Sequence, residues 1–313
     1  MNMEAEGIVD VFAPVTRVAP CVVVGIEVNG QVQVTSLGAD GDTCAEETIF
    51  EIGSITKTFT ALLLAEMAQR NEVALDDPAS KFVRTQNQAL SQVTLVDLAT
   101  HTARFPRVPR DLWGRALRNH ENPYHDYCES RLENALSRIR ARRGVSKRVR
   151  YSNFGYATLG YVLSKVAGVP YEHLIDGRLC DPLGLDSTSF ALASDLEQRF
   201  VRGHKKRGRE VSRWDLVSFA PAGGLKSSVG DLLTYVRAHV HPGNSPLAGS
   251  LTDVQQPRVD IRKGRLAVGL AWFIGHHKGM TIAWHGAARA ASVRSQASLL
   301  RPGCPWLLWR MPK

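Results

Sequence analysis

The sequence lacks any long hydrophobic run. A helix that crosses a membrane needs about 20 consecutive apolar residues, and no uninterrupted apolar stretch of this chain approaches that length. The first 20 residues carry acidic side chains where a secretory signal peptide needs a basic start. Unless translation begins upstream, we expect a cytoplasmic protein with no membrane partner.

Cysteine is scarce, and its spacing shows no zinc-binding pattern. The five cysteines in 313 residues are odd in number, widely spaced and without a paired C-x-x-C motif. They are Cys21, Cys44, Cys128, Cys180 and Cys304. We therefore expect free, mostly buried thiols rather than disulfides.

The histidines show no spacing with carboxylates that is typical of a metal site. We interpret five of the 10 as surface or packing residues: His101, His120, His125, His276 and His277. No motif indicates a metal or an organic cofactor. We therefore expect the protein to work without either.

Basic residues outnumber acidic ones, 39 to 30, for a formal net charge of +9. The excess is concentrated in residues 138–150 and 202–209. Neither aromatic residues interleaved for RNA stacking nor a DNA-binding motif accompanies these stretches. We interpret them as solvated helix ends and loops and expect no nucleic-acid partner; the alternative is a nucleic-acid binder.

The N-terminal segment predicts a β-hairpin followed by a long helix. Two β-rich runs, Cys21–Val28 and residues 31–37, are joined through Asn29-Gly30, a dipeptide that favours a tight turn. Farther on, apolar residues at helical spacing predict a largely buried helix over residues 54–70. This helix begins at or beside Ser54.

Shorter helices are predicted over residues 94–100, 154–167 and 228–239. Ser228 can cap the last of these helices. Asp231 lies three residues on, where a capping box places an acid.

Strand character returns at residues 266–274 and 280–284, separated by the turn-forming residues 275–279. Strands at both ends with helices between them indicate an α/β fold of the α+β type. In this fold an antiparallel sheet is formed from the N- and C-terminal segments and flanked by helices. We predict a sheet subdomain over residues 1–75 and 215–286, a mainly helical insertion over 76–214 and an aberrant tail over 287–313.

Ser54-Ile55-Thr56-Lys57 forms an S-x-x-K motif at the start of the predicted long helix. Residues three apart share a helix face, so the amine of Lys57 can reach the hydroxyl of Ser54. The helix N-terminus also favours negative charge there. A serine needs such a neighbouring base to act as a nucleophile. The spacing also arises by chance, and the alternative is a helix cap with a surface lysine.

Tyr151-Ser152-Asn153 stands directly before the helix predicted over residues 154–167. An S-x-x-K motif followed by Y-x-N and then by an H-x-G strand resembles the serine β-lactamase and penicillin-binding-protein superfamily, in particular its class C and esterase-like branch. Further stretches resemble its flanks: residues 50–54 (FEIGS), 98–102 (LATHT), 151–160 (YSNFGYATLG), 181–185 (DPLGL) and 221–225 (PAGGL). The resemblance covers about residues 21–285 and implies a β-lactamase/transpeptidase-like fold.

The resemblance implies a role for each matched residue. Ser54 would attack a carbonyl and become acylated, while Lys57 and Tyr151 share the proton transfers. Which of the two is the base stays open. Asn153 would bind an amide or carbonyl group of the substrate, and it can also cap the helix that follows it.

Trp284-His285-Gly286 is the candidate for the third motif. The resemblance implies that His285 and Gly286 line the substrate-binding strand. The oxyanion hole would be formed by the backbone N–H groups of Ser54 and, on this strand, of a residue near Ala288. A lone histidine near a strand end can also be purely structural.

After Gly286 the chain departs from the family pattern. The family continues with a glycine-rich turn, an aromatic residue, two strands and a C-terminal helix, whereas residues 287–313 bring arginine, proline and tryptophan into strand positions. The third base of each codon from Gly286 onward, read with the first two bases of the next, permits the family-like continuation G-G-T-G-G-F-R-S. We hypothesise a single-base deletion near codon 286, a frameshift; the alternative is a genuine divergent C-terminus.

Loss of these strands and of the helix would expose apolar surface at a cost of about 25 cal/mol per Å², against a total stability of about 5–15 kcal/mol. We therefore predict a poorly soluble or inactive polypeptide. The function we expect is a serine hydrolase that forms an acyl-enzyme on Ser54 with a small-molecule amide, β-lactam or ester. A cytoplasmic location slightly favours an ester. The alternative is an impaired pseudoenzyme or a binding protein of the same fold, and the oligomeric state stays open.

Overall fold

The computed structural model describes residues 21–28, 30–38, 44–83, 87–119, 122–139, 148–203, 212–277, 280–288 and 294–301. Asn29, His120 and Cys304, which are interpreted above, lie outside these ranges. Most of both basic stretches and most of the tail lie outside them as well.

The described strands form three antiparallel sheets. The first pairs β1 with β2, the second pairs β3 with β4, and the third has the order β5-β6-β7-β8-β9. Their bounds are Cys21–Val28 (β1), Gln31–Gly38 (β2), Phe50–Glu51 (β3), Lys226–Ser227 (β4), Val259–Arg262 (β5), Leu266–Val268 (β6), Phe273–His277 (β7), Met280–Ala288 (β8) and Arg294–Arg301 (β9). The predicted hairpin is confirmed, since Cys21 pairs with Gly38 and Val28 with Gln31, and Gly30 at its turn has a φ of 81°.

The sheets differ from the sequence-based expectation in two ways. We expected one sheet shared by both ends of the chain, but the described strands leave β1-β2 separate from β5–β9; both β1 and β9 instead contact helix α11 (Val229–Val240). The strand expected over residues 266–274 is also interrupted. The Gly269 N–H donates to the Trp272 carbonyl at 2.8 Å, which turns the chain between β6 and β7. The turn residues are buried and apolar, so the hydrophobic pattern hid the break.

The predicted helices are confirmed to within a few residues. They are α2 (Thr56–Gln69), α3 (Leu95–Ala99), α6 (Asn153–Ala167) and α11 (Val229–Val240). The other helices and short turns are η1 (Gly53–Ile55), η2 (Ala79–Lys81), η3 (Gln88–Gln92), α4 (Arg110–Arg118), α5 (Glu129–Ser137), α7 (Tyr171–Ile175), η4 (Asp176–Cys180), α8 (Asp181–Leu183), α9 (Ser194–Gln198), η5 (Val217–Phe219), α10 (Ala220–Gly223), η6 (Pro242–Asn244) and α12 (Ala248–Asp253). Ser228 caps α11 by accepting the Asp231 N–H at 3.1 Å. The Asp231 carboxylate, however, binds the Ser187 N–H and the Thr188 hydroxyl on a neighbouring segment.

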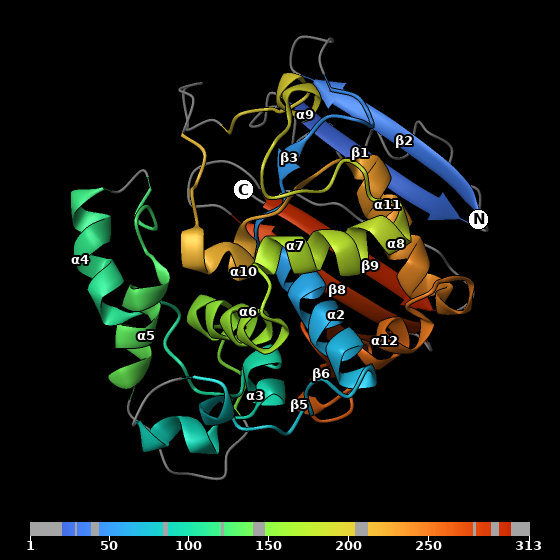
Figure 1. Cartoon of the computed structure of the whole chain (residues 1–313). Coiled ribbons are helices and arrows are strands. Elements are labelled where there is room, and N and C mark those ends of the chain that lie inside the picture. The colour runs from blue at the N-terminus through green and yellow to red at the C-terminus, as the bar shows by residue number, and fades with distance from the viewer. Residues whose placement is uncertain are drawn as a thin grey trace.

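Helix α2 lies at the centre of the molecule (Figure 1). Its residues from Thr56 to Met67 are all buried, and it packs against α6 and α10. The contact between α6 and α10 depends on Gly160, because a Cβ there would lie 2.2 Å from Cγ of Pro221. This close approach fixes α10 beside the first turn of α2.

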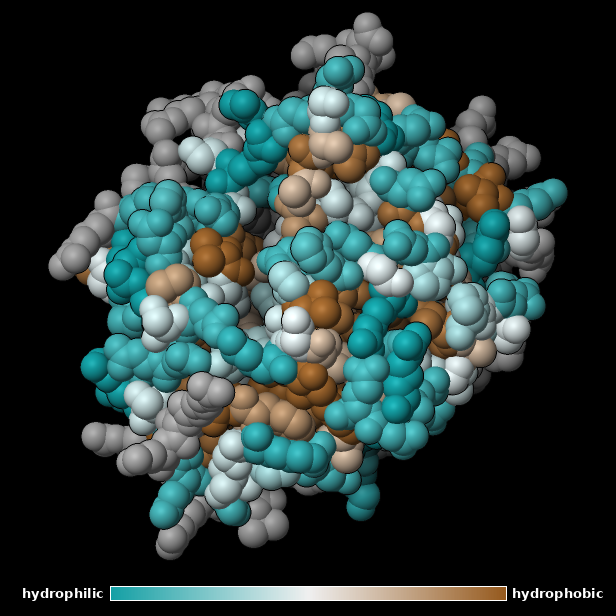
Figure 2. All heavy atoms as spheres, in the orientation of Figure 1, coloured by the Kyte–Doolittle hydropathy of each residue, from teal (hydrophilic) through white to brown (hydrophobic). Residues whose placement is uncertain are grey.

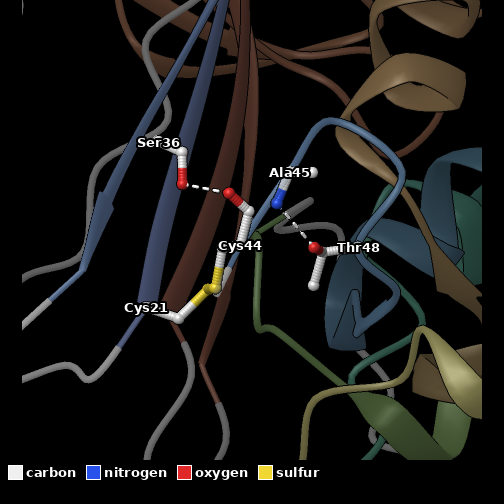
Figure 3. The surroundings of a disulfide bond; sticks show 5 residues. All are labelled: Cys21, Ser36, Cys44, Ala45 and Thr48. Carbon is white, nitrogen blue, oxygen red and sulfur yellow. Dashed lines mark hydrogen bonds between the residues drawn. A yellow bond between two sulfur atoms is a disulfide. The ribbon is translucent and has the colours of Figure 1, made fainter. Parts of the chain in front are cut away.

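Cys21 and Cys44 form a disulfide, which corrects the expectation of free thiols (Figure 3). The bond joins the start of β1 to the segment that precedes β3, across a sequence separation of 23, with the Cα atoms 6.0 Å apart. The spacing of the cysteines could not reveal this pair, because only the folded hairpin brings them together. Cys128 is exposed and free, and Cys180 is buried and free, as expected.

The described arginines of the two basic stretches are exposed, as expected: Arg138, Arg148, Arg150 and Arg202. Figure 2 shows hydrophilic side chains over most of one face, with hydrophobic patches among them. Within the described ranges, no helix combines the length and the apolar character that crossing a membrane requires. The subdomain boundaries at residues 75/76 and 214/215 stay predictions.

Candidate active site

Ser54 lies in the tight turn η1, directly before α2. The turn begins at Gly53, whose φ of 50° belongs to the left-handed region that favours glycine. Strand β3 leads into it and pairs with β4, so the chain reaches the turn from a fixed direction. Ser54 is partly exposed, whereas the helix that follows is buried. The first turn therefore leaves Ser54 partly accessible, next to a buried helix.

Lys57 lies in the first turn of α2, with its side chain fully buried. Its Nζ is 3.0 Å from Oγ of Ser54. The amine also donates a hydrogen bond to the carbonyl oxygen of Ala222 on α10. Burial lowers the pKa of Lys57 well below its usual value, and the positive charge of Arg107 lowers it further. The structure thus contains a buried amine, next to the serine hydroxyl, whose neutral form is favoured.

Tyr151 closes over the same pair from a separate segment. Its hydroxyl is hydrogen-bonded to the side chain of Ser54, and its ring centroid is 4.9 Å from Nζ of Lys57. Burial raises the pKa of Tyr151 to about 12, and the hydrogen bond to Ser54 and the charge of Arg107 oppose that rise. Ser54, Lys57 and Tyr151, which the motifs single out separately, are therefore brought together. The tyrosine is a protonated phenol at neutral pH.

Asn153 begins α6, but it does not cap the helix. The N-cap is Ser152, whose Oγ accepts the Gly155 N–H at 2.9 Å. The suggestion that Asn153 is the cap is therefore wrong. Asn153 instead makes a side-chain hydrogen bond with Tyr124, and its buried Oδ1 has no hydrogen-bond partner among the described residues. A substrate-binding role for that oxygen stays a prediction.

Strand β8 forms the opposite wall of the site and contacts η1. A Cβ placed on Gly53 would lie 3.3 Å from the Cβ of Ala287. Along this strand Gly286 is exposed, while His285 and Ala287 face inward and are buried. Ala288 pairs with Arg294 of β9, so its backbone belongs to the sheet. The oxyanion-hole and substrate-binding roles of these residues stay predictions.

His285 is fully buried, and its ring lies 6.3 Å from that of Tyr151, centroid to centroid. Its Nδ1 lies 2.9 Å from the carbonyl oxygen of Ala271 and donates to it in the neutral ring. Burial, with the nearby charge of Lys57, lowers the pKa of His285 to about 4. A neutral His285 therefore lies behind Tyr151 and Lys57.

The tail after Gly286 differs in part from our expectation. We expected it to lose strand character, but Arg294–Arg301 forms β9, which pairs with β8 from Thr281 to Ala288. The expectation is wrong for this segment because antiparallel pairing uses backbone groups, which every residue except proline supplies in full. The frameshift hypothesis and the predicted loss of solubility or activity stay predictions.

Two residues near the site were not singled out as site residues in the sequence. His101, interpreted as a surface or packing residue, is 1% exposed and lies with its ring 4.4 Å from that of Tyr151. Arg107 has its guanidinium carbon 5.7 Å from the Tyr151 ring centroid. His101 lies within the LATHT stretch at residues 98–102, so the resemblance contained a signal; for Arg107 the sequence contained none.

The described residues contain no cluster of three or more histidine, cysteine, aspartate or glutamate side chains that could hold a metal ion. The groups that the structure brings close to the Ser54 hydroxyl are the amine of Lys57 and the phenol of Tyr151. An amine and a phenol can move protons, as acyl transfer to a serine requires.

The chain is similar in sequence to known proteins. The model of a family described as Beta-lactamase matches residues 9–296. A beta-lactamase of Pseudomonas fluorescens is 28% identical over 224 residues, which are 68% of this chain and 58% of that protein. The D-alanyl-D-alanine-carboxypeptidase/endopeptidase AmpH of Escherichia coli strain K12 is 26% identical over 198 residues, 62% of this chain and 49% of that protein. The chain thus spans about half to three-fifths of the length of these curated relatives.

Among solved structures, a class C beta lactamase from Rhodobacter sphaeroides is similar to this chain with a TM-score of 0.79 at 20% sequence identity. The alignment covers 95% of this chain and 90% of that chain. This similarity confirms the predicted fold class, a mixed α and β fold with antiparallel sheets and flanking helices.

Proposed function

Because this chain belongs to the beta-lactamase family, we propose that it is a serine hydrolase that forms an acyl-enzyme on Ser54. The observation that carries the proposal is the 3.0 Å distance between Nζ of Lys57 and Oγ of Ser54, in a place where burial lowers the pKa of the amine. A neutral amine at hydrogen-bond distance is the base that a serine nucleophile needs.

Lys57 is the better candidate for the base of the two residues that the motifs leave open. Burial favours its neutral, proton-accepting form, whereas burial raises the pKa of Tyr151 to about 12 and keeps the phenol protonated. We assign proton acceptance from Ser54 to Lys57 and proton relay to Tyr151, whose hydroxyl also bonds to Ser54.

The reaction then follows in two stages. As Oγ of Ser54 bonds to the substrate carbonyl carbon, the serine proton moves to Nζ of Lys57. The carbonyl oxygen becomes negative and is held by the backbone N–H groups of Ser54 and Ala288. Cleavage of the bond to the leaving nitrogen or oxygen returns that proton through Tyr151 to the leaving atom. In the second stage Lys57 takes a proton from water, and the water oxygen bonds to the acyl carbon of the ester. The bond from that carbon to Oγ of Ser54 then breaks, the carboxylic acid product leaves, and Lys57 returns the proton to Oγ of Ser54.

The substrate we propose is a small amide, β-lactam or ester, with Asn153 bound to its amide or carbonyl group and His285 and Gly286 on the opposite wall. The names of two relatives, a beta-lactamase and a D-alanyl-D-alanine-carboxypeptidase/endopeptidase, support an amide or lactam. An impaired pseudoenzyme is a second candidate, which the departure of the tail from the family pattern favours.

Covalent labelling tests the proposal. The full chain is incubated with a fluorescent penicillin and, separately, with an activated p-nitrophenyl ester, and the labelled peptide is identified by mass spectrometry. We expect label on Ser54, none in Ser54→Ala, and unchanged labelling in the control Ser91→Ala, an exposed serine that bonds only within its own turn. A folded wild-type chain that takes no label from either probe would support the pseudoenzyme and overturn the proposal.

A further inference from the structure

The segment that carries Tyr151 is held on both sides by one residue, His101. The Arg150 N–H donates to the carbonyl oxygen of His101 at 2.8 Å. The Ser152 N–H donates to Nδ1 of the same histidine at 3.2 Å. The two hydrogen bonds come from the residues directly before and after the tyrosine. We propose that His101 is a positioning residue that holds the Tyr151 hydroxyl at Ser54; this inference rests on the function proposed above.

The backbone of His101 makes this two-sided contact possible. Helix α3 ends at Ala99, and His101 follows with a φ of 62°, in the left-handed region. Glycine and asparagine are the usual residues at such a helix end. A positive φ is uncommon for residues other than glycine, although histidine adopts it more often than most. A residue held in a sparsely populated conformation motivates a hypothesis of function. Here the conformation presents both the carbonyl group and the ring to the Tyr151 segment.

The ring of His101 is fixed in place and in protonation state. It is 1% exposed, with centroids 4.4 Å from the Tyr151 ring and 5.0 Å from the Tyr156 ring. Tyr156 in turn donates to the carbonyl oxygen of Ala99 at 2.6 Å. Since Nδ1 accepts the Ser152 N–H, it carries no proton, and the proton of the neutral ring lies on Nε2. Burial lowers the pKa of His101 well below its usual value, so the ring stays neutral and Nδ1 stays an acceptor.

A second support lies after the tyrosine. The carbonyl oxygen of Arg107 accepts the N–H groups of Asn153 at 3.0 Å and of Phe154 at 3.1 Å. These bonds fix the start of α6. Both involve residues that follow Tyr151, and neither holds Arg150, the residue before it. The Ser152 hydroxyl also donates to the carbonyl oxygen of Pro106 at 2.7 Å. His101, in contrast, bonds to the backbone on both sides of Tyr151.

Two substitutions separate the acceptor from the backbone conformation. Glycine and asparagine both tolerate a positive φ, and both remove the imidazole ring. Only asparagine places a carbonyl oxygen near the position of Nδ1. In His101→Gly we expect the rate constant of Ser54 acylation to fall about 100-fold, the lower range for a proton-transfer group, with KM nearly unchanged. In His101→Asn we expect recovery to within about tenfold of wild type, since the acceptor is restored.

The same pair is repeated in a Tyr151→Phe background, and amide hydrogen exchange of Ser152 is measured in parallel. If His101 acts through the tyrosine hydroxyl, His101→Gly has little further effect in Tyr151→Phe, and Ser152 loses protection in His101→Gly but keeps it in His101→Asn. Equal rates for the glycine and asparagine variants, a full effect of glycine in the Tyr151→Phe background, or unchanged Ser152 protection would overturn the positioning role. A wild-type chain that is not acylated overturns the proposed function first, and that result is distinct because it needs no variant.

Discussion

The two walls of the site are built in different ways. The serine wall, defined by Ser54, Lys57 and Tyr151, is held by side-chain contacts: an amine 3.0 Å from the hydroxyl and a phenol bonded to it. The strand wall, residues 285–288 of β8, is held by the backbone ladder to β7 and β9. Side-chain contacts require particular residues, whereas a ladder forms with many sequences. The strand wall can thus keep its place even where the sequence has left the family pattern.

The largest effect should come from removing the amine of the serine wall. We expect Lys57→Met to lower Ser54 acylation by about 10²–10⁴-fold, the usual contribution of a general base. Stability should change little, because loss of the buried amine removes its desolvation cost while the carbonyl of Ala222 loses its donor. Stopped-flow acylation with an activated ester and thermal unfolding measure the two quantities.

The matched control is Lys81→Met, at an exposed lysine paired with Asp77, which should leave acylation unchanged. A Lys57→Met enzyme as fast as wild type would mean that Tyr151 or another group is the base.

A repaired tail tests the strand wall. If restoring one base at codon 286 returns the family-like continuation, a correctly placed oxyanion donor should raise acylation by about 10²–10³-fold and increase the soluble, monomeric fraction. Nitrocefin and p-nitrophenyl ester assays, with size-exclusion chromatography, compare the two chains. Equal rates and equal solubility would show that β9 of the present chain already completes the strand wall, and the expected gain from the repair would be wrong.

His285 makes the strand wall sensitive to acid. Its pKa is about 4 in the folded chain against an ordinary 6.5, so between these values the unfolded chain binds a proton that the folded chain does not. Stability is therefore complete above about pH 6.5, falls as the pH drops towards 4 and changes no further below that. Over the whole window the loss attributable to this residue is about 3 kcal/mol.

Urea unfolding at several pH values checks this linkage. In His285→Asn, which keeps a donor for the carbonyl of Ala271, the fall between pH 6.5 and 4 should be smaller than in wild type. Replacing the exposed His276 by asparagine should not change it. Identical pH slopes in wild type and His285→Asn would contradict the assignment.

The smallest effect concerns the support behind the serine wall. Gly160→Ala should destabilise the chain by about 1–3 kcal/mol, because the new methyl group would meet the rigid ring of Pro221 at 2.2 Å. Since α10 carries Ala222, acylation should also slow. The control is Gly114→Ala in helix α4, where nothing lies within 4 Å; there alanine should be neutral or stabilise by up to about 1 kcal/mol. Thermal unfolding of both variants measures these stability changes. If Gly160→Ala does not lower the stability, α10 can shift to make room for the methyl group.

The sequence predicted what depends on local spacing. Ser54 and Lys57 share a helix face because they lie three residues apart. The helices α2 and α6 were predicted because their apolar residues recur at helical spacing. The order of the motifs also predicted the fold class. The roles of Asn153, His285, Gly286 and Ala288 stay predictions.

What depends on distant parts of the chain could not be predicted. The two hydrogen bonds of His101 join residues about 50 positions apart, and no local pattern records them. Asp231 matched a capping box but binds Ser187 and Thr188 across the fold. The break between β6 and β7 lies inside an apolar run, because the turn itself is buried.

The bond between Cys21 and Cys44 ties the shape of the N-terminal hairpin to the redox state of its surroundings. A host that keeps thiols reduced would leave the hairpin without its covalent anchor, whereas an oxidising compartment would lock it to the segment before β3. Samples of one sequence prepared in the two settings would then differ in resistance to heat and proteases, so dithiothreitol in a buffer becomes an experimental variable.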